Sequence, residues 1–163
     1  MSAAITEGPV RTRERFEFTA NAPVEVAWPL FGAEGERAWA PDWYPRFIWP
    51  ATATDEEGMV FTVDRADLTA VWVNTVFDQA AGRIQYVSVI PDVVVTVITL
   101  SLKETGPSTH VEVIYERTAL AATAGEAVNQ LAAGDRVAGP QWCRQINHHL
   151  AALTKIKRQF DIS

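Results

Sequence analysis

The chain has 163 residues, of which 48% are hydrophobic and 21% charged, a composition typical of one globular domain and unlike that of a disordered chain. Its 20 acidic and 14 basic residues give a formal charge of −6, so a nucleic acid is not expected as a partner because its phosphates would be repelled. No apolar run approaches the roughly 20 residues of a transmembrane helix, and we therefore expect no membrane span.

The first residues divide into a tail and a strand. Residues 1–10 have no periodicity and are expected to form a flexible tail, which leaves 11–163 as a single domain. From residue 11 to residue 19, charged residues alternate with Phe16 and Phe18. This period of two predicts a strand with one apolar face.

Two short helices are expected after this strand. The sequence Asn21-Ala22-Pro23 is typical of a helix start, and Gly32 should end that helix. A second helical piece is expected over 35–39, before Pro41.

Most of the chain from residue 49 to residue 118 is rich in β-branched and aromatic residues, which favour strands. The short connections between successive strands require antiparallel neighbours. Residues 64–67 are interpreted as a solvated turn. The expected strands are Met59–Val63, Thr69–Phe77, Arg83–Ile90, Val93–Lys103 and Thr109–Thr118, and in the last of them Val111, Val113, Tyr115 and Arg117 share the covered face.

Two helices are expected in the C-terminal part, a short one over 126–133 and a long one over 140–158. A single sheet with one apolar face must be covered, and only the longer helix can do this. Because a twisted sheet cannot meet a straight helix everywhere, we expect a cavity between them. The inward stripe of that helix is Trp142, Ile146, His149, Leu150, Leu153 and Ile156, whereas Gln141, Gln145, His148 and Lys155 should face water.

This order of elements, with the segments 26–31 and 35–43, resembles the START/Bet v 1-like superfamily, whose bacterial members are described as SRPBCC or polyketide cyclase/dehydratase-like proteins. The resemblance covers residues 12–157. It implies an α+β helix-grip fold: a curved seven-stranded antiparallel sheet around the long C-terminal helix, two short helices after the first strand, and a deep apolar pocket. Further matching segments are Phe77-Asp78, Gly82-Arg83-Ile84, Tyr115 to Leu120, and Trp142.

Three functions fit this resemblance. The leading hypothesis is a protein that binds a hydrophobic small molecule, such as a lipid, polyketide or aromatic compound, in the cavity. The second is a cyclase/dehydratase-like enzyme that uses the same pocket for acid/base chemistry without a metal, with His149, Tyr115 and Arg117 as catalytic candidates. The third is an Aha1-like protein-interaction domain, which would expose an apolar patch.

Aromatic residues dominate the predicted ligand site, beginning with the cluster around residues 39–49. These rings could equally plug the end of the sheet, and strand register decides whether Trp72 and Tyr86 face the cavity. The full candidate set is Trp39, Trp43, Tyr44, Phe47, Trp72, Tyr86, Tyr115, Arg117, Trp142, Ile146, His149, Leu150 and Leu153.

Two of these candidates have structural alternatives. His149 could be a core histidine satisfied by one hydrogen bond, which is the favoured interpretation. A buried Arg117 needs a carboxylate, and a pairing with Asp42 or Glu36 at the sheet end is favoured over an acidic ligand group.

No phosphate loop, nucleophile elbow or His-x-x-x-His pair occurs, so neither a cofactor nor a metal is expected. The single cysteine, Cys143, allows no intramolecular disulfide and is interpreted as a small buried residue rather than a nucleophile. The first residues lack the features of a secretory signal, and a cytoplasmic protein, monomeric or homodimeric, is expected.

Overall fold

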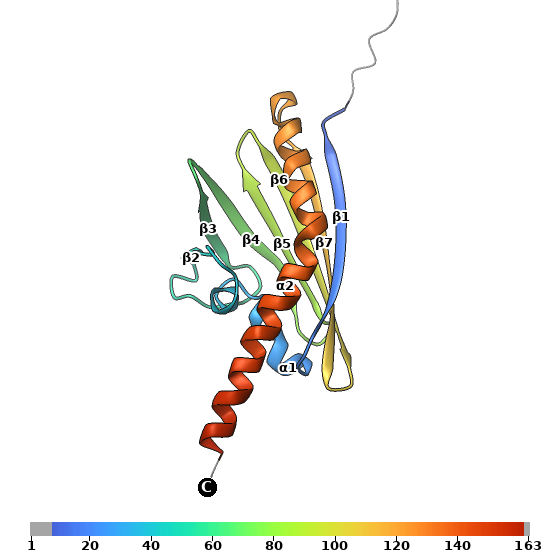
Figure 1. Ribbon diagram of the computed structural model, residues 1–163. Coiled ribbons are helices and arrows are strands. Elements are labelled where there is room, and N and C mark those ends of the chain that lie inside the picture. Colours follow the sequence, from blue (N-terminus) through green and yellow to red (C-terminus); the bar gives the residue numbers. More distant parts are fainter. Residues whose placement is uncertain (1–7, 162–163) are drawn as a thin grey trace, which may run out of the picture.

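The computed structural model describes residues 8–161, which form one curved antiparallel sheet and a long helix laid across its concave face (Figure 1). The order of the seven strands is β1-β7-β6-β5-β4-β3-β2, so the first and last strands of the chain are hydrogen-bonded neighbours. The strands are β1 (Arg11–Ala20), β2 (Arg46–Trp49), β3 (Val60–Arg65), β4 (Leu68–Asp78), β5 (Arg83–Ile90), β6 (Val94–Thr105) and β7 (Ser108–Ala119).

The helical elements lie on one side of this sheet. After β1 the chain forms the short helix α1 (Val24–Ala27), which continues into two 3₁₀ turns, η1 (Trp28–Phe31) and η2 (Gly35–Ala38). After β7 it forms η3 (Ala122–Ala124) and then α2 (Gly125–Phe160). The predicted helix-grip architecture is therefore confirmed, including Gly32 as the residue that ends the first helical segment.

The strands follow from alternation in the sequence. Phe16 and Phe18 in β1 are buried, as are Val111 and Val113 in β7, and the residues between them are more exposed. Strand β2 was not predicted as a separate element, because only four residues form it. Of the predicted tail, residues 1–7 lie outside the described residues, and Val10 accepts a backbone hydrogen bond from Ala119 at 2.9 Å.

Helix α2 has 36 residues, and the prediction that it begins near residue 140 after a separate helix is wrong. The helix passes through Gly134 and Pro140 without interruption. Its N-terminal half buries residues at spacings of four, three and four, but these are mostly small or polar, so the apolar periodicity is weak in the sequence. They are Val128, Ala132, Asp135 and Gly139.

Helix α2 is attached to one edge of the sheet rather than to its middle. A side chain on Gly139 would come within 3.2 Å of Phe16, so the absence of a side chain allows the helix to approach β1 closely. Further along, Asn147 donates to the Thr19 carbonyl at 2.9 Å and accepts from the Asn21 amide at 2.8 Å. Because α2 lies along β1, it leaves the concave side of β3–β5 to be covered by the segment around η2.

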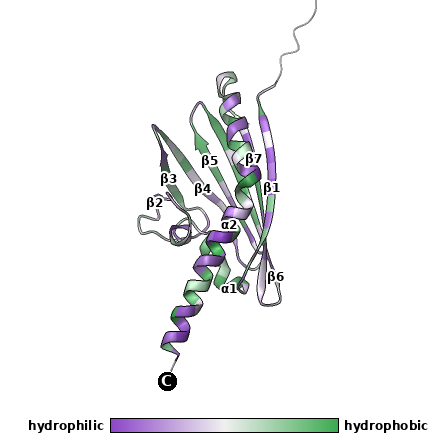
Figure 2. Cartoon of the chain, viewed as in Figure 1, coloured by the Kyte–Doolittle hydropathy of each residue, from purple (hydrophilic) through white to green (hydrophobic). Residues whose placement is uncertain are grey.

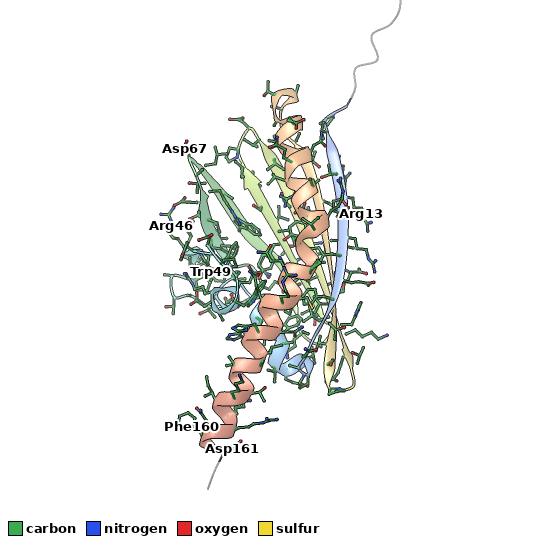
Figure 3. All side chains as sticks on the ribbon, in the orientation of Figure 1. Arg13, Arg46, Trp49, Asp67, Phe160 and Asp161 are labelled. Atoms are coloured by element: carbon green, nitrogen blue, oxygen red, sulfur yellow. The ribbon has the colours of Figure 1, made fainter. Side chains whose placement is uncertain are left out.

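Hydropathy follows this arrangement (Figure 2), since strands β4 and β5 are mostly hydrophobic while α2 alternates between hydrophilic and hydrophobic residues. The C-terminal turns of α2 extend beyond the sheet, and Phe160 near their end is 81% exposed (Figure 3). Among the described residues, no helix is long and apolar enough to cross a membrane.

Candidate functional site

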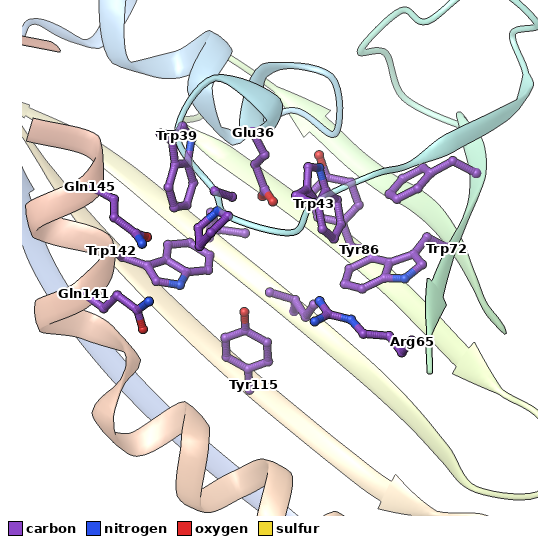
Figure 4. Close-up of a pocket in the computed structure, with 15 residues that line it drawn as sticks. Glu36, Trp39, Trp43, Arg65, Trp72, Tyr86, Tyr115, Gln141, Trp142 and Gln145 are labelled. Atoms are coloured by element: carbon purple, nitrogen blue, oxygen red, sulfur yellow. The ribbon is translucent and has the colours of Figure 1, made fainter. Parts of the chain in front are cut away.

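A cavity of about 290 Å³ lies between the η2 segment, the concave face of the sheet and helix α2 (Figure 4). Every layer of the fold contributes to it, and four of the six tryptophans of the chain are in its lining. The lining residues are Glu36, Trp39, Ala40, Pro41, Trp43, Phe61, Arg65, Trp72, Tyr86, Ile98, Leu100, Tyr115, Gln141, Trp142 and Gln145.

The tryptophans form two walls of aromatic rings. Trp39 and Trp142 meet edge to face with ring centroids 5.1 Å apart, which connects the η2 segment to α2. On the other side, Trp43 meets Trp72 edge to face at 5.6 Å, and Trp72 stacks on Phe61 at 5.7 Å. Such pairs contribute stability beyond the area that they bury, so the walls are held in fixed positions.

Polar atoms of three rings donate hydrogen bonds to backbone carbonyls in η1 and just after it. Trp39 Nε1 donates to the Leu30 carbonyl at 2.7 Å, and Trp43 Nε1 donates to the Ala33 carbonyl at 2.8 Å. The Tyr86 hydroxyl donates to the Phe31 carbonyl at 2.9 Å. These bonds satisfy donors that burial would otherwise leave unpaired, and they fix the rings around an open volume.

The turn η2 brings a carboxyl group to the cavity. A Cβ on Gly35 would lie 1.6 Å from the Pro29 carbonyl oxygen, so only glycine allows this close approach of η2 to η1. Asp55 accepts hydrogen bonds from the amides of Glu34 at 2.9 Å and Gly35 at 3.1 Å, which hold the start of the turn. The side chain of the next residue, Glu36, points into the cavity (Figure 4).

Burial raises the pKa of Glu36 from 4.5 to about 8, and the negative charge of nearby Asp55 adds to this increase, while Arg65 opposes it. The group is therefore mostly protonated at neutral pH, and it can donate a hydrogen bond or exchange a proton near that pH.

Residues 64–67 are all exposed, in agreement with the predicted solvated turn, but Arg65 also lies in the cavity lining, which was not predicted. The turn itself is present, with Ala66 at φ 52°, but Arg65 precedes it as the last residue of β3. Phe61 and Val63 are buried on the concave face, and a period of two places Arg65 on the same face. That alternation was the sequence signal that could have identified it.

Helix α2 contributes amides where water-facing residues were expected. Gln141 and Gln145 line the cavity, so the prediction that they lie on the side of the helix opposite the sheet is wrong, although Gln141 is also exposed to water as predicted. The physical reason is the position of α2 along β1, which turns the flank of the helix as well as its apolar stripe towards the sheet interior.

The structure places six of the predicted ligand-binding residues in the cavity lining, and it resolves the question of register because Trp72 and Tyr86 both face inward. Burial raises the pKa of Tyr115, so its hydroxyl stays neutral over the ordinary pH range. The six residues are Trp39, Trp43, Trp72, Tyr86, Tyr115 and Trp142.

The other candidates lie elsewhere. Tyr44 is 70% exposed, Phe47 packs against Phe61 with ring centroids 5.7 Å apart, and Ile146 is a fully buried core residue. Leu150 and Leu153 line a separate, smaller cavity of about 180 Å³ between α2, the start of α1 and the β6–β7 turn. These residues therefore do not contribute to the tryptophan-lined cavity.

His149, the predicted acid/base residue, is half-buried and lies outside both cavity linings. It also makes no hydrogen bond to another side chain or loop within residues 8–161, so the acid/base mechanism that requires it in the pocket has no structural basis. Its neighbours on the predicted apolar stripe, Ile146 and Leu150, are buried as expected. Ile156, at the end of that stripe, is 50% exposed because the sheet ends before it.

Arg117 does not pair with Asp42 or Glu36, and this prediction is corrected. Its guanidinium donates from Nε and Nη2 to the two carboxylate oxygens of Asp135, both at 2.7 Å, and from Nη1 to Thr96 at 3.0 Å. The partner was missed because Asp135 lies in the N-terminal half of α2, which was not predicted to continue the long helix.

Within residues 8–161, no three or more His, Cys, Asp or Glu side chains form a group that could hold a metal ion. Cys143 is a free, half-buried thiol with Sγ 3.9 Å from the Thr19 carbonyl oxygen. The ionisable groups of the cavity are thus Glu36, Arg65, Tyr86 and Tyr115.

Comparisons with known proteins support the architecture. Norcoclaurine synthase from Thalictrum flavum, in complex with dopamine and hydroxybenzaldehyde, is similar with a TM-score of 0.63 at 12% identity, over 90% of this chain and 88% of that chain. The protein XoxI from Bacillus cereus is similar with a TM-score of 0.59 at 18% identity, over 89% and 98% of the two chains.

DynU16, a protein of the dynemicin biosynthetic locus, is similar with a TM-score of 0.56 at 17% identity, over 85% of this chain and 47% of that chain. No protein-family model and no curated protein matches the sequence. At these identities the similarity establishes the fold, and the fold implied by the sequence resemblance is confirmed.

Proposed function

Because the chain has the helix-grip fold of the START/Bet v 1-like superfamily, we propose that it binds a small aromatic molecule in the tryptophan-lined cavity. The observation that carries this proposal is a volume of about 290 Å³ bounded by four tryptophans. This volume is at the lower end of the roughly 300–1,000 Å³ of ligand pockets. It suits one or two fused rings better than a long lipid chain.

The ring walls favour an aromatic ligand over an aliphatic one. Flat rings can stack on Trp72 or meet Trp39 and Trp142 at their edges, and each such contact adds to the energy of area burial. Norcoclaurine synthase, which has the same fold, is described in complex with two small aromatic compounds, and DynU16 belongs to a biosynthetic locus. The description of norcoclaurine synthase agrees with this class of ligand for the present chain.

Uptake of a neutral fluorescent dye tests the proposal. N-phenyl-1-naphthylamine becomes fluorescent in apolar surroundings and carries no charge, so it reports on the cavity independently of electrostatics. The half-buried Ala40 lines the cavity, and Ala40→Phe should fill part of it and weaken dye binding at least tenfold. The same change at the exposed Ala151 on α2, Ala151→Phe, is the matched control and should bind like the wild type.

Circular dichroism should give the same spectrum for both variants, which separates a filled cavity from a lost fold. Saturable dye binding by the wild type that only Ala40→Phe removes supports the proposal. No dye uptake by the folded wild type, or equal uptake by Ala40→Phe, contradicts it.

A second candidate is an acid/base enzyme of the cyclase/dehydratase kind in the same pocket. The observation that favours it is Glu36, whose pKa of about 8 allows it to give or take a proton at neutral pH. Tyr115, which lines the same cavity, is the available hydroxyl donor. Dehydration of an aromatic β-hydroxy ketone, which loses water and yields a conjugated enone, provides a test by ultraviolet absorbance.

In this assay the wild type should form the enone. The variant Glu36→Gln should form none, although it should still bind the dye. Absence of turnover by the wild type leaves the binding function as the better account and rejects this acid/base role for that substrate class. The third hypothesis, an Aha1-like interaction domain, has exposed apolar side chains in Tyr44, Ile48 and Trp49 near the edge strand β2, but nothing there identifies a partner.

A further inference from the structure

The cavity has an unusual balance of charge for an aromatic pocket. Among the residues that the structure describes, Glu36 and Arg65 are the only formally charged side chains of its lining, and the carboxyl of Glu36 is mostly protonated at neutral pH because its pKa is raised. Arg65 remains charged at any ordinary pH. The cavity therefore carries a net positive charge near pH 7, although the whole chain carries −6.

Two acidic side chains of neighbouring elements have other partners, and the carboxyl of Glu36, whose charge would interact with that of Arg65, is mostly protonated because its pKa is raised. Asp135 accepts two hydrogen bonds from Arg117, and Asp64 accepts from Arg46 at 3.3 Å and from Thr69 at 2.7 Å. Within the described part of the chain, Arg65 makes neither a salt bridge nor a side-chain hydrogen bond. A guanidinium at the wall of an aromatic pocket is thus available to a ligand.

The polar groups around the same volume can all donate a hydrogen bond. The Arg65 guanidinium, the Tyr115 hydroxyl and the amides of Gln141 and Gln145 converge on one space, opposite the carboxyl of Glu36 (Figure 4). Among the residues described, the Tyr115 hydroxyl has no hydrogen-bond partner. A protonated Glu36 adds another donor, so the complementary ligand group is an oxygen-rich acceptor.

From this placement we infer that the ligand is an aromatic carboxylic acid, whose rings lie between the tryptophans and whose carboxylate is bound by the Arg65 guanidinium. This inference rests on the proposed function and adds to it the charge of the ligand. Arginine suits this role because its planar fork matches both carboxylate oxygens. A neutral aromatic amide of the same shape lacks the negative charge and should bind more weakly.

Competition against N-phenyl-1-naphthylamine tests the inference with a matched set of probes: 2-naphthoate, the neutral 2-naphthamide and the cationic 2-naphthylmethylamine. For the wild type at pH 7, naphthoate should displace the dye at a concentration at least tenfold lower than naphthamide requires, and the amine should be the weakest. Arg65→Met keeps most of the side-chain stem and removes the charge. Measured against its own affinity for the dye, this variant should lose the tenfold preference for naphthoate over naphthamide.

Arg46→Met is the control, because Arg46 lies on the neighbouring strand β2, is exposed and is outside the cavity lining. It removes the same charge from the protein and should keep the preference, which separates a local contact from a change in net charge. Equal displacement by naphthoate and naphthamide, or a preference that survives Arg65→Met, overturns the inference while leaving the proposed function in place. A wild type that binds no dye and no probe overturns both.

Discussion

Replacing Glu36 by glutamine tests the electrostatics of the cavity through protein stability. In the folded chain the pKa of Glu36 is raised from 4.5 to about 8, chiefly because burial penalises the charged carboxylate. Between these two pH values the folded state holds a proton that the unfolded state has released. The free energy of unfolding therefore decreases as the pH rises from 4.5 to 8, and Glu36→Gln removes this contribution.

The magnitude follows from the two pKa values. The difference between 4.5 and about 8, at about 1.4 kcal/mol per pKa unit, sets a ceiling of about 5 kcal/mol. Water that enters the cavity around the ionised carboxylate lowers the actual cost. Near pH 5 the variant should match the wild type, and at pH 9 it should be more stable by an amount below this ceiling.

Other ionisable groups near Glu36 do not remove the expected difference. These are Asp55 in the loop before β3, Arg65 on β3, Tyr86 on β5 and Tyr115 on β7, and they are present in both proteins. Helix α2 contributes Gln141, Trp142 and Gln145 to the lining, and none of these side chains titrates.

Urea unfolding followed by tryptophan fluorescence at pH 5, 6, 7, 8 and 9 measures the effect. The exposed Glu57→Gln is the matched control and should parallel the wild type at every pH. A difference between Glu36→Gln and wild type that does not change with pH would refute the reasoning. So would a wild type that gains stability relative to the variant as the pH rises.

Three further substitutions test the fold by urea unfolding at pH 7. Asp135→Asn should lower the free energy of unfolding by about 3–5 kcal/mol, because it leaves the Arg117 guanidinium buried without its carboxylate. Combining Arg117→Met with Asp135→Leu should recover most of this loss. A negligible cost for the single variant would show that the pair is solvated. Ile146→Ala should cost about 2–5 kcal/mol, since the side chain is fully buried in the main hydrophobic core, and a loss below 1 kcal/mol would contradict that burial. Pro140→Ala should stabilise the chain by about 1–2 kcal/mol, because it supplies the missing helical N–H at an exposed position, and a loss of stability would show that the proline is needed there.

Most of the architecture could be predicted from the sequence. Alternating residues identified β1, β3 to β7 and the buried faces of β1 and β7, and the run of short connections required an antiparallel sheet. The clustering of tryptophans around residues 39–49 also indicated an aromatic site. In the first half of α2, small residues such as Ala132 and Gly139 occupy buried positions, so the sequence shows no clear apolar period there. For this reason that half was not predicted to belong to the long helix.

Individual roles within the site depended on tertiary structure. His149 lies on the predicted apolar stripe, yet α2 packs along β1 in an orientation that leaves this imidazole outside the cavity and places Gln145 inside it. Glu36 and Arg65 are ordinary charged residues by local pattern. Their importance arises only when η2 and the end of β3 meet over the same space.

The sequence by itself determined the order of strands and helices, because the spacing of apolar residues is a local property that fixes which face of each element must be buried. Only the tertiary structure decided which polar groups share the cavity and which carboxylate neutralises each arginine. Those outcomes depend on how far α2 lies from the centre of the sheet, a distance set by contacts between residues more than a hundred positions apart, such as Asn147 with Thr19.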